Sequence, residues 1–261
     1  MHIFNSYYCL DKKKLDNLPI GLFGDFYSHE LSFNLINEND FKNLESIFKR
    51  CNLKIKKILL ESFVKGSIIS DKNSNIDTFL HIQLNEKNTK VFYVENDSIK
   101  FEQKFKFGTD IIANDISKIT SLDIKEVKQF IKNNSNLENV KESDLLEKEY
   151  FKEDRYRKIK KKLIIDIAEA RIKELFEILF YENINFKGSL KKIKIVFLET
   201  TDELNLNCFK KIYKEYFLIK NKLDLKFIKK FETEEIIDAA CKIVHFGWKK
   251  EAIPVAQLKK S

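Results

Sequence analysis

The sequence predicts an α/β fold, in which strands and helices alternate along a chain of 261 residues. Runs of alternating apolar and polar residues, typical of strands, occur between stretches with apolar residues at helical spacing. These two signals are interleaved from one end of the chain to the other, and no internal repeat is detected. The length suits one large domain or two modest ones with a sizeable core.

Several segments have the composition and boundaries of strands, because they are rich in β-branched and aromatic residues and lie between turn residues. The first two are joined by a turn that contains Pro19, Gly21 and Gly24. In the sixth, Phe101 and Phe105 alternate with charged residues, which indicates a one-sided sheet. In chain order, the predicted strands are residues 2–11, 26–36, 53–62, 77–84, 90–95, 98–107, 191–199 and 223–229.

Helices are predicted where apolar residues recur on one side of a helical projection. The first ends at Asn52, a residue type suited to the left-handed conformation at a helix end. Another begins at Asp123, with Glu126 three residues later as in a capping box. The longest has an apolar stripe opposite Asp166 and Glu169. In chain order, the predicted helices are residues 39–52, 109–119, a segment from 123, 161–180, 202–217 and 234–247.

The charge pattern argues against nucleic acid as a partner. The net charge of +8 comes from 48 basic and 40 acidic residues, and the basic ones are diluted among carboxylates along the whole chain. Only residues 155–162, "RYRKIKKK", form a dense basic run, which either binds an anionic partner or is the solvated start of a helix. The polar residues 133–157 lack a clear period, and we expect a mobile or surface segment there.

Cysteine, histidine and glycine usage excludes several kinds of site. Cys9, Cys51, Cys208 and Cys241 lie far apart in or beside apolar stretches, which predicts buried thiols in a reducing compartment. The four histidines are equally scattered, so no zinc site is indicated. The six glycines, none adjacent to another, exclude a P-loop and a dinucleotide-binding fingerprint. With no membrane-spanning or signal-peptide pattern, a cytosolic protein is expected.

Five stretches, kept in order, resemble the actin-like bacterial cell-division protein FtsA. They are "HIFNSYYCLDKKKLDNLPIGLFG", "NLESIFKRCNLKIKKILLES", "FKFGTDIIANDISKITSLDIKEVKQFIKNN", "LIIDIAEARIKELFEIL" and "EEIIDAACKIVHFG". Gly108 and Asp115 occupy positions that match the family's pattern. The resemblance spans nearly the whole chain and implies an actin-like, ribonuclease-H-like α/β fold that corresponds to the C-terminal part of an FtsA-like architecture.

The resemblance also implies a division of the chain, which would be a fragment of a longer gene product or a reduced protein. Its parts would be a remnant of the small inserted (SHS2-like) subdomain, the end of the first actin-like subdomain with a connecting helix, the second core subdomain, a peripheral subdomain with the partner-binding helix, and a C-terminal tail. In that order they are residues 1–38, 39–73, 74–120 with 189–250, 121–188 and 251–261.

The family's second phosphate loop falls on "QLNEKNTK", where its chemistry is absent. The family's aspartates serve hydrated magnesium, and its glycines present backbone amides to phosphate. Its Asp, three glycines, Thr and second Asp fall on Gln83, Asn85, Glu86, Lys87, Asn88 and Lys90. Its adenosine-binding turn falls on Leu198, Glu199 and Thr200. We therefore expect a simple hairpin loop, no nucleotide cofactor and no ATP hydrolysis, although ATP serves the family.

Arg171, with Lys161 and Lys162 ten and nine residues before it, resembles the family's contact for the acidic, extended C-terminal tail of FtsZ. The alternative is an exposed arginine paired within its helix with Glu174 or Glu177. The resemblance implies a noncatalytic division scaffold that binds the FtsZ tail at the cytoplasmic face of the inner membrane at the division site, and that self-associates.

Membrane contact would require a helix after Ser261, and no nucleic acid is expected as a partner. The alternatives are an actin-superfamily ATPase or small-molecule kinase, which would need glycine-rich loops, and the related pilus-assembly actin-like protein.

Overall fold

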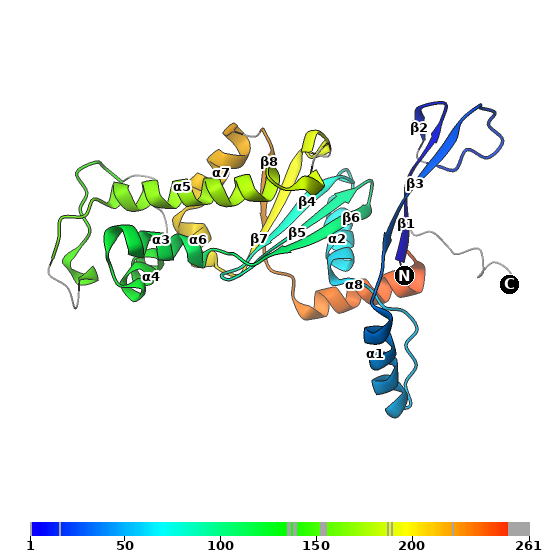
Figure 1. Ribbon diagram of the computed structural model, residues 1–261, viewed down its shortest axis with the longest axis horizontal. Coiled ribbons are helices and arrows are strands. Elements are labelled where there is room, and N and C mark those ends of the chain that lie inside the picture. The colour runs from blue at the N-terminus through cyan, green and yellow to red at the C-terminus, as the bar shows by residue number, and fades with distance from the viewer. Residues whose placement is uncertain are drawn as a thin grey trace. The chain divides into compact units, whose positions relative to one another are not determined.

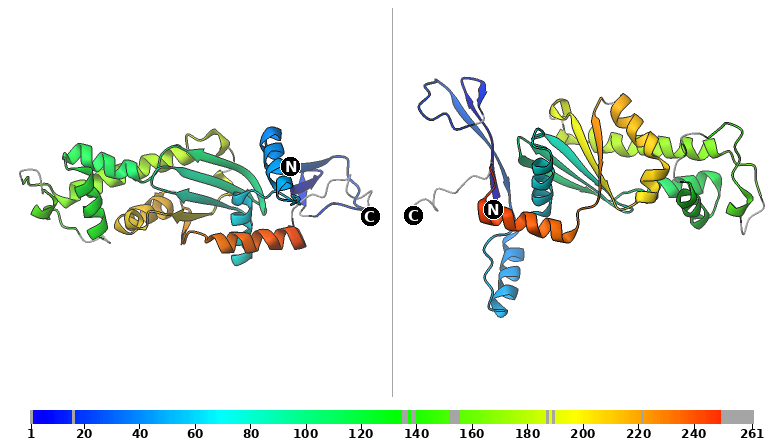
Figure 2. Two further views of the ribbon diagram at one scale, coloured as in Figure 1. Left: turned by 90° about the horizontal axis from the view of Figure 1, so that it is seen from below. Right: turned by 180° about the vertical axis from the view of Figure 1, so that it is seen from behind.

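Strands and helices alternate along the chain, as Figures 1 and 2 show for the computed structural model. The structure describes residues 2–15, 17–134, 137, 140–151, 156–186, 188, 190–220 and 222–249. The predicted C-terminal tail, residues 251–261, lies outside them. The chain forms two compact units. Unit 1 comprises Met1–Thr78, Phe92–Glu102 and Phe231–Ser261, and unit 2 comprises Phe79–Val91 and Gln103–Lys230. The finer five-part division stays a prediction.

Unit 1 contains a three-stranded antiparallel sheet in the order β2-β1-β3. Asp11 and Lys12, with φ of 50° and 67°, form the two-residue turn between the first two strands, as a hairpin of this twist requires. The Asp11 carboxylate also accepts hydrogen bonds from the backbone amides of Asp25 and Phe26, which holds the loop between the second and third strands. The strands are β1 (His2–Leu10), β2 (Lys13–Leu15) and β3 (Tyr27–Asn34).

The helices of unit 1 are α1 (Glu38–Arg50), α2 (Glu61–Lys72) and α8 (Thr233–Phe246). The strand predicted at residues 53–62 is wrong, because residues 53–60 form no strand and α2 begins at Glu61. Every side chain of α2 from Ser62 to Ser70 is buried. A helix buried all round has no polar face, so its sequence shows no helical period.

The five-stranded sheet has the order β6-β5-β4-β7-β8. β7 is parallel to both β4 and β8. The links between β4, β5 and β6 are too short for crossovers, so these strands are antiparallel neighbours. The first three strands of this sheet follow one another as hairpins, and β7 and β8 then add in parallel beside β4. This is the strand order of the ribonuclease-H-like sheet in actin-like folds, which confirms the predicted α/β class. The strands are β4 (Phe79–Leu84), β5 (Thr89–Glu95), β6 (Ser98–Phe105), β7 (Ile195–Thr200) and β8 (Asp224–Ile228).

The helices of unit 2 pack around an aromatic cluster. The ring of Phe176 lies 4.7 Å from that of Phe217 and 5.3 Å from that of Tyr216. The single helix predicted at 202–217 is wrong, since it is interrupted at Phe209 and ends in a π-helical turn, Tyr216–Lys220. The wider turn lets two consecutive aromatic residues reach Phe176. The helices are α3 (Asp110–Thr120), α4 (Ile124–Asn133), α5 (Lys161–Phe180), α6 (Glu203–Cys208) and α7 (Lys210–Glu215).

The polar segment 133–157 lies largely at the surface where the structure describes it, as its composition predicts, but a few buried side chains anchor it. Where the structure describes it, Leu146, Tyr150 and Phe151 are buried, and Asn133 donates a hydrogen bond from Nδ2 to the Tyr150 hydroxyl. Short 3₁₀ turns lie here and before β7, at Lys148–Tyr150, Ile184–Phe186 and Leu190–Lys192.

The predicted burial of all four thiols is wrong for three of them. Only Cys208 is buried, whereas Cys9 is partly exposed and Cys51 and Cys241 are exposed. Cys51 directly follows the last residue of α1 and Cys241 lies on α8, and composition cannot distinguish such positions from the core. Burial raises the pKa of Cys208 to about 12.

We expect Cys208 to resist a thiol reagent at pH 8 in the folded protein, since the reacting species is the thiolate. Cys51 and Cys241 should react at once. Reagent titration in the presence and absence of denaturant measures this, with Cys208→Ser as the control that removes the late-reacting thiol. Equal rates for all cysteines in the folded protein would contradict the structure.

Candidate functional site

The turn between β4 and β5, where the resemblance to FtsA predicts a phosphate loop, is closed by its own hydrogen bonds. The backbone amide of Asn85 donates to the carbonyl oxygen of Asn88 at 3.0 Å. The side-chain amide of Asn85 donates to the Asn88 side-chain oxygen at 3.2 Å. Thr201 also donates from its hydroxyl to the Asn85 side-chain oxygen. The predicted hairpin turn is therefore present, and its two asparagines stabilise it.

The first turn of α3 packs directly on this hairpin turn. The backbone amides of Thr109 and Asp110 donate to the carbonyl oxygens of Asn85 and Glu86, each at 3.0 Å. Gly108 makes this approach possible, because a Cβ there would lie 2.1 Å from the Asn85 carbonyl oxygen. Amides at a helix start are the usual donors to a bound anion. Here two of them are already occupied by backbone carbonyls.

A small hollow of about 90 Å³ lies beside this contact and is mostly acidic. Glu86, Asp110 and Asp202 line it, and Lys128 is the cation among its lining residues. Asp202 accepts hydrogen bonds from the Thr109 hydroxyl and from the backbone amide of the third residue of α6, so its carboxylate is held in place. Phosphate would meet three carboxylates and no glycine-lined loop, so these residues do not fit a nucleotide.

The predicted positions Gln83 and Glu199 do come together, on the buried neighbouring strands β4 and β7. They are directly opposite in the parallel register, and Gln83 Nε2 donates to Glu199 Oε2 at 2.9 Å. His81 Nε2 lies 2.9 Å from the same oxygen. Thr200 donates from its hydroxyl to the Leu84 carbonyl oxygen. A polar layer inside the sheet therefore stands where the family places its nucleotide-binding turn.

The remaining loop residues lie at the surface, where Lys87 is exposed and Lys90 is half-buried. Analysis of the sequence missed Thr109 and Asp202, which tie the hairpin turn, α3 and α6 together. For Asp202 a signal was available, because an aspartate directly before a helix is a typical N-cap.

The three cations predicted to bind a partner lie on α5 and all have carboxylate neighbours in the chain. Arg171 pairs with Asp115 of α3 and, at 2.8 Å, with Glu174 one turn along its own helix. Lys161 pairs with Glu147, and Lys162 pairs with the next turn's Asp166 at 3.1 Å, which raises the pKa of Lys162. The predicted pairing of Arg171 with Glu174 in its own helix is thus present in the structure, whereas the partner-binding role of Arg171 stays a prediction.

Lys162 also lines a hollow of about 130 Å³ between α5 and the α6–α7 segment. Its apolar lining includes Ile165, Phe209 and Ile212, and a second cation, Lys211, lies at the same hollow. Lys211 lies 3.9 Å from the carboxylate of Glu215, and both side chains are about half exposed. The hollow therefore combines an apolar floor with two cations, and the carboxylates of Glu169 and Glu215 also line it.

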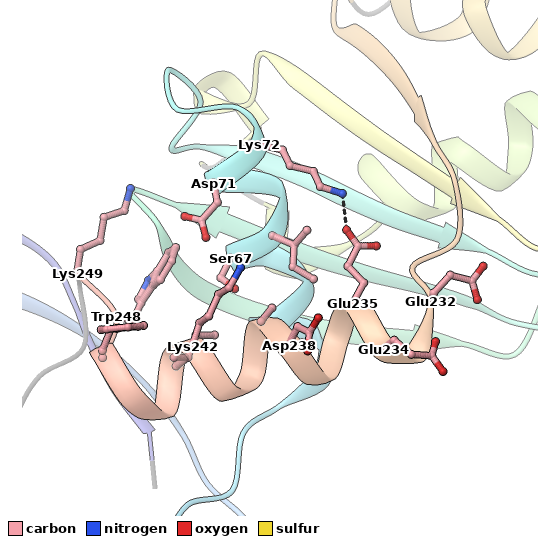
Figure 3. A pocket seen from close by; sticks show the side chains of 15 residues that line it. Ser67, Asp71, Lys72, Glu232, Glu234, Glu235, Asp238, Lys242, Trp248 and Lys249 are labelled. Atoms are coloured by element: carbon pink, nitrogen blue, oxygen red, sulfur yellow. Dashed lines mark hydrogen bonds and ion pairs between the residues drawn. The ribbon is translucent and has the colours of Figure 1, made fainter.

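Unit 1 holds a larger groove of about 1030 Å³ between α2 and α8 (Figure 3). Lys72 of α2 forms an ion pair with Glu235 of α8 across it. At one end Trp248 donates from Nε1 to the Asp97 carbonyl oxygen at 2.9 Å and packs edge-on against Phe63. Analysis of the sequence could not find this groove, because α2 was not predicted.

Within the part of the chain that the structure describes, no cluster of three or more His, Cys, Asp or Glu side chains could hold a metal ion. None of the helices described there is long and apolar enough to cross a membrane.

No family model and no curated protein matches the sequence. Among solved structures, MreB 5 of Spiroplasma citri bound to AMPPNP aligns over 80% of this chain and 65% of its own, with 14% identity and a TM-score of 0.45. The ethanolamine utilization protein EutJ from Carboxydothermus hydrogenoformans aligns over 74% and 57%, with 10% identity and a TM-score of 0.41. The archaeal actin homolog Ta0583 aligns over 69% and 54%, with 12% identity and a TM-score of 0.38. This chain spans less than two thirds of each, and the fold assignment rests on its strand order.

Proposed function

We propose that the protein is a divergent, noncatalytic FtsA-like scaffold that acts through protein contacts at the division site. The observation that supports this best is the closed contact between the hairpin turn and α3. Amides that could hold phosphate donate instead to Asn85 and Glu86, and carboxylates surround the contact. A protein with this turn has the scaffold of an actin-like fold without the means to hold a nucleotide's phosphates.

The partner we propose is the acidic, extended C-terminal tail of FtsZ, bound at the hollow beside α5. Lys162 and Asp166 have side chains 38% and 52% exposed, so water and salt screen the attraction between them. A tail carboxylate can therefore replace Asp166 at little cost, while apolar tail residues cover Ile165 and Ile212. Arg171 is more enclosed, since its ion pair with Asp115 has side chains 25% and 15% exposed, so it positions α5 on α3.

Peptide binding tests this partner. A labelled FtsZ tail peptide should bind the whole chain with an affinity that falls as salt rises, because charge pairs are screened. Lys162→Glu with Lys211→Glu should weaken binding at least about 10-fold, since each places a like charge opposite the tail. Lys104→Glu, at an exposed position of β6, is the control and should leave binding unchanged. Binding that is absent, or equal in both variants, would contradict the proposed partner.

Calorimetry with ATP and magnesium tests the loss of nucleotide binding separately. We expect no heat of binding and no change in Tm. If ATP did bind, a concentration of about 100 times its Kd would stabilise the fold by about 2.7 kcal/mol, which would raise the Tm measurably. Thermal unfolding of the same sample with inorganic phosphate is the control for nonspecific anion effects. Micromolar binding of ATP would overturn the noncatalytic assignment and favour an actin-superfamily ATPase.

A further inference from the structure

Residues 18–53 expose an unusual amount of apolar surface. More than half of the large apolar side chains that are exposed in the described residues lie there. Phe23 is fully exposed and Phe33 is 62% exposed. Contiguous apolar surface of this kind marks an interaction site in a folded protein.

The sheet of β1, β2 and β3 has its apolar face outward. The register places Ile3, Leu31 and Phe33 on one side, and a bulge at residue 6 brings Tyr8 to the same side, where its ring stacks on His29 at 4.4 Å. The opposite side carries Phe4, which is fully buried against Phe63, and Glu30, which pairs with Lys100. The covered side is thus the more polar one, whereas on the apolar side Tyr27, Leu31 and Phe33 are 45–62% exposed in the part of unit 1 that the structure describes.

The helix α1 also exposes its apolar side. Its apolar stripe consists of Phe41, Leu44, Ile47 and Phe48, yet no residue of α1 is buried. Ile47 is 58% exposed, and Figure 1 shows α1 extending away from its own sheet. A helix of this length measures about 20 Å and an eight-residue strand about 27 Å, so α1 can lie along most of the outward face.

The charges indicate which copy of α1 covers this face. Residues 35–37 are the only link between β3 and α1, so a helix folding back on its own sheet must run antiparallel to β3. That places Lys49 and Arg50 beside Lys13, which lies on the apolar face opposite Leu10. A helix from another molecule can run the other way and bring Glu38 and Asp40 to Lys13 instead.

We propose that α1 docks on the outward face of the β1–β3 sheet of a second copy of this chain, reciprocally, in a symmetric dimer. A Phe or Tyr side chain buries about 150–250 Å². Phe33, Ile47, Tyr27, Leu31 and Phe48 still expose 37–62% of their surface. Together with the partly exposed apolar residues of both faces, and doubled by symmetry, they reach the lower end of the roughly 1,200–2,000 Å² of a stable interface. This inference concerns unit 1 only and does not rest on the proposed function.

Sedimentation of the whole chain over a concentration series tests the dimer. The chain should be dimeric, and Phe33→Glu or Ile47→Glu should each raise the dimer Kd about 100-fold, since each places a charge in an apolar contact. Ile184→Glu, at an exposed apolar residue of unit 2, is the matched control and should stay dimeric. A monomer at all concentrations, or a dimer that both variants retain, would overturn the proposal.

Two further experiments separate exchange between copies from docking within one copy. Mixing the Phe33→Glu and Ile47→Glu variants should restore a heterodimer, because one intact helix then meets one intact sheet face. Lys13→Glu should weaken the dimer, and Glu38→Lys with Asp40→Lys should rescue it. If the mixed variants formed no heterodimer and the charge reversal restored no dimer, this surface would have another occupant. A monomer that binds lipid vesicles through the same residues would show the same.

Discussion

Gly108→Ala should lower the free energy of unfolding by at least about 3 kcal/mol. The added Cβ would lie 2.1 Å from the Asn85 carbonyl oxygen and 2.4 Å from the Glu86 carbonyl oxygen, and both are backbone atoms that no rotamer change can move. Relieving the clash separates α3 from the hairpin turn and breaks two hydrogen bonds, each contributing about 1 kcal/mol. Overpacking adds about 1–3 kcal/mol.

Urea unfolding monitored by circular dichroism measures this loss. Gly66→Ala is the matched control, because its Cβ would be 3.4 Å from the Val94 side chain and Gly66 lies inside α2. Alanine is a better helix former than glycine by about 1 kcal/mol, so this variant should be as stable as the parent or more so. A Gly108→Ala protein with parental stability would show that α3 does not close the hairpin turn.

Glu199→Ala should cost about 3 kcal/mol through a different mechanism. Glu199 is 3% exposed and its carboxylate serves both His81 and Gln83, which are also buried. Removing the carboxylate leaves the Gln83 amide without this acceptor, and an unsatisfied buried polar group costs about 1–3 kcal/mol. A cavity adds to the loss. Glu199→Gln keeps an acceptor at the same place and should cost less than Glu199→Ala.

Thermal and urea unfolding of the two variants, beside Glu182→Ala, provides the comparison. Glu182 is exposed, so its replacement should change stability by no more than about 0.5 kcal/mol. If Glu199→Ala behaved like Glu182→Ala, the buried polar layer would contribute nothing to the sheet. Neither result depends on which partner the protein binds, so both test the fold of the candidate site alone.

Local patterns predicted much of the fold because their physical causes are local. Asn52 adopts φ of 57°, as expected of a residue that ends a helix, and Asp123 accepts a hydrogen bond from the Lys125 amide, as expected of an N-cap. The alternation of apolar and charged residues in β6 predicts a strand with one side toward solvent, and the charged residues Glu102 and Lys104 are indeed exposed. Such features involve residues a few positions apart, so a short window of sequence contains the whole interaction.

The candidate site could be predicted only in part. The residue types at Gln83, Asn85 and Glu86 could be read directly, because the sequence alone shows whether a loop contains glycines or carboxylates. The closure by Thr109 and the link through Asp202 were not visible, since these residues lie far along the chain from the hairpin turn.

By itself, the sequence determined the alternation of strands and helices, the loss of glycine-rich loops and the amphipathic character of α1 and α5. Tertiary structure alone decided that α2 is a helix, because a helix buried on every side has no polar face to reveal its period. It also decided that Arg171 pairs with Asp115 and that the apolar face of the β1–β3 sheet points outward. Both depend on which distant segment supplies the neighbour, and residue type does not encode that choice.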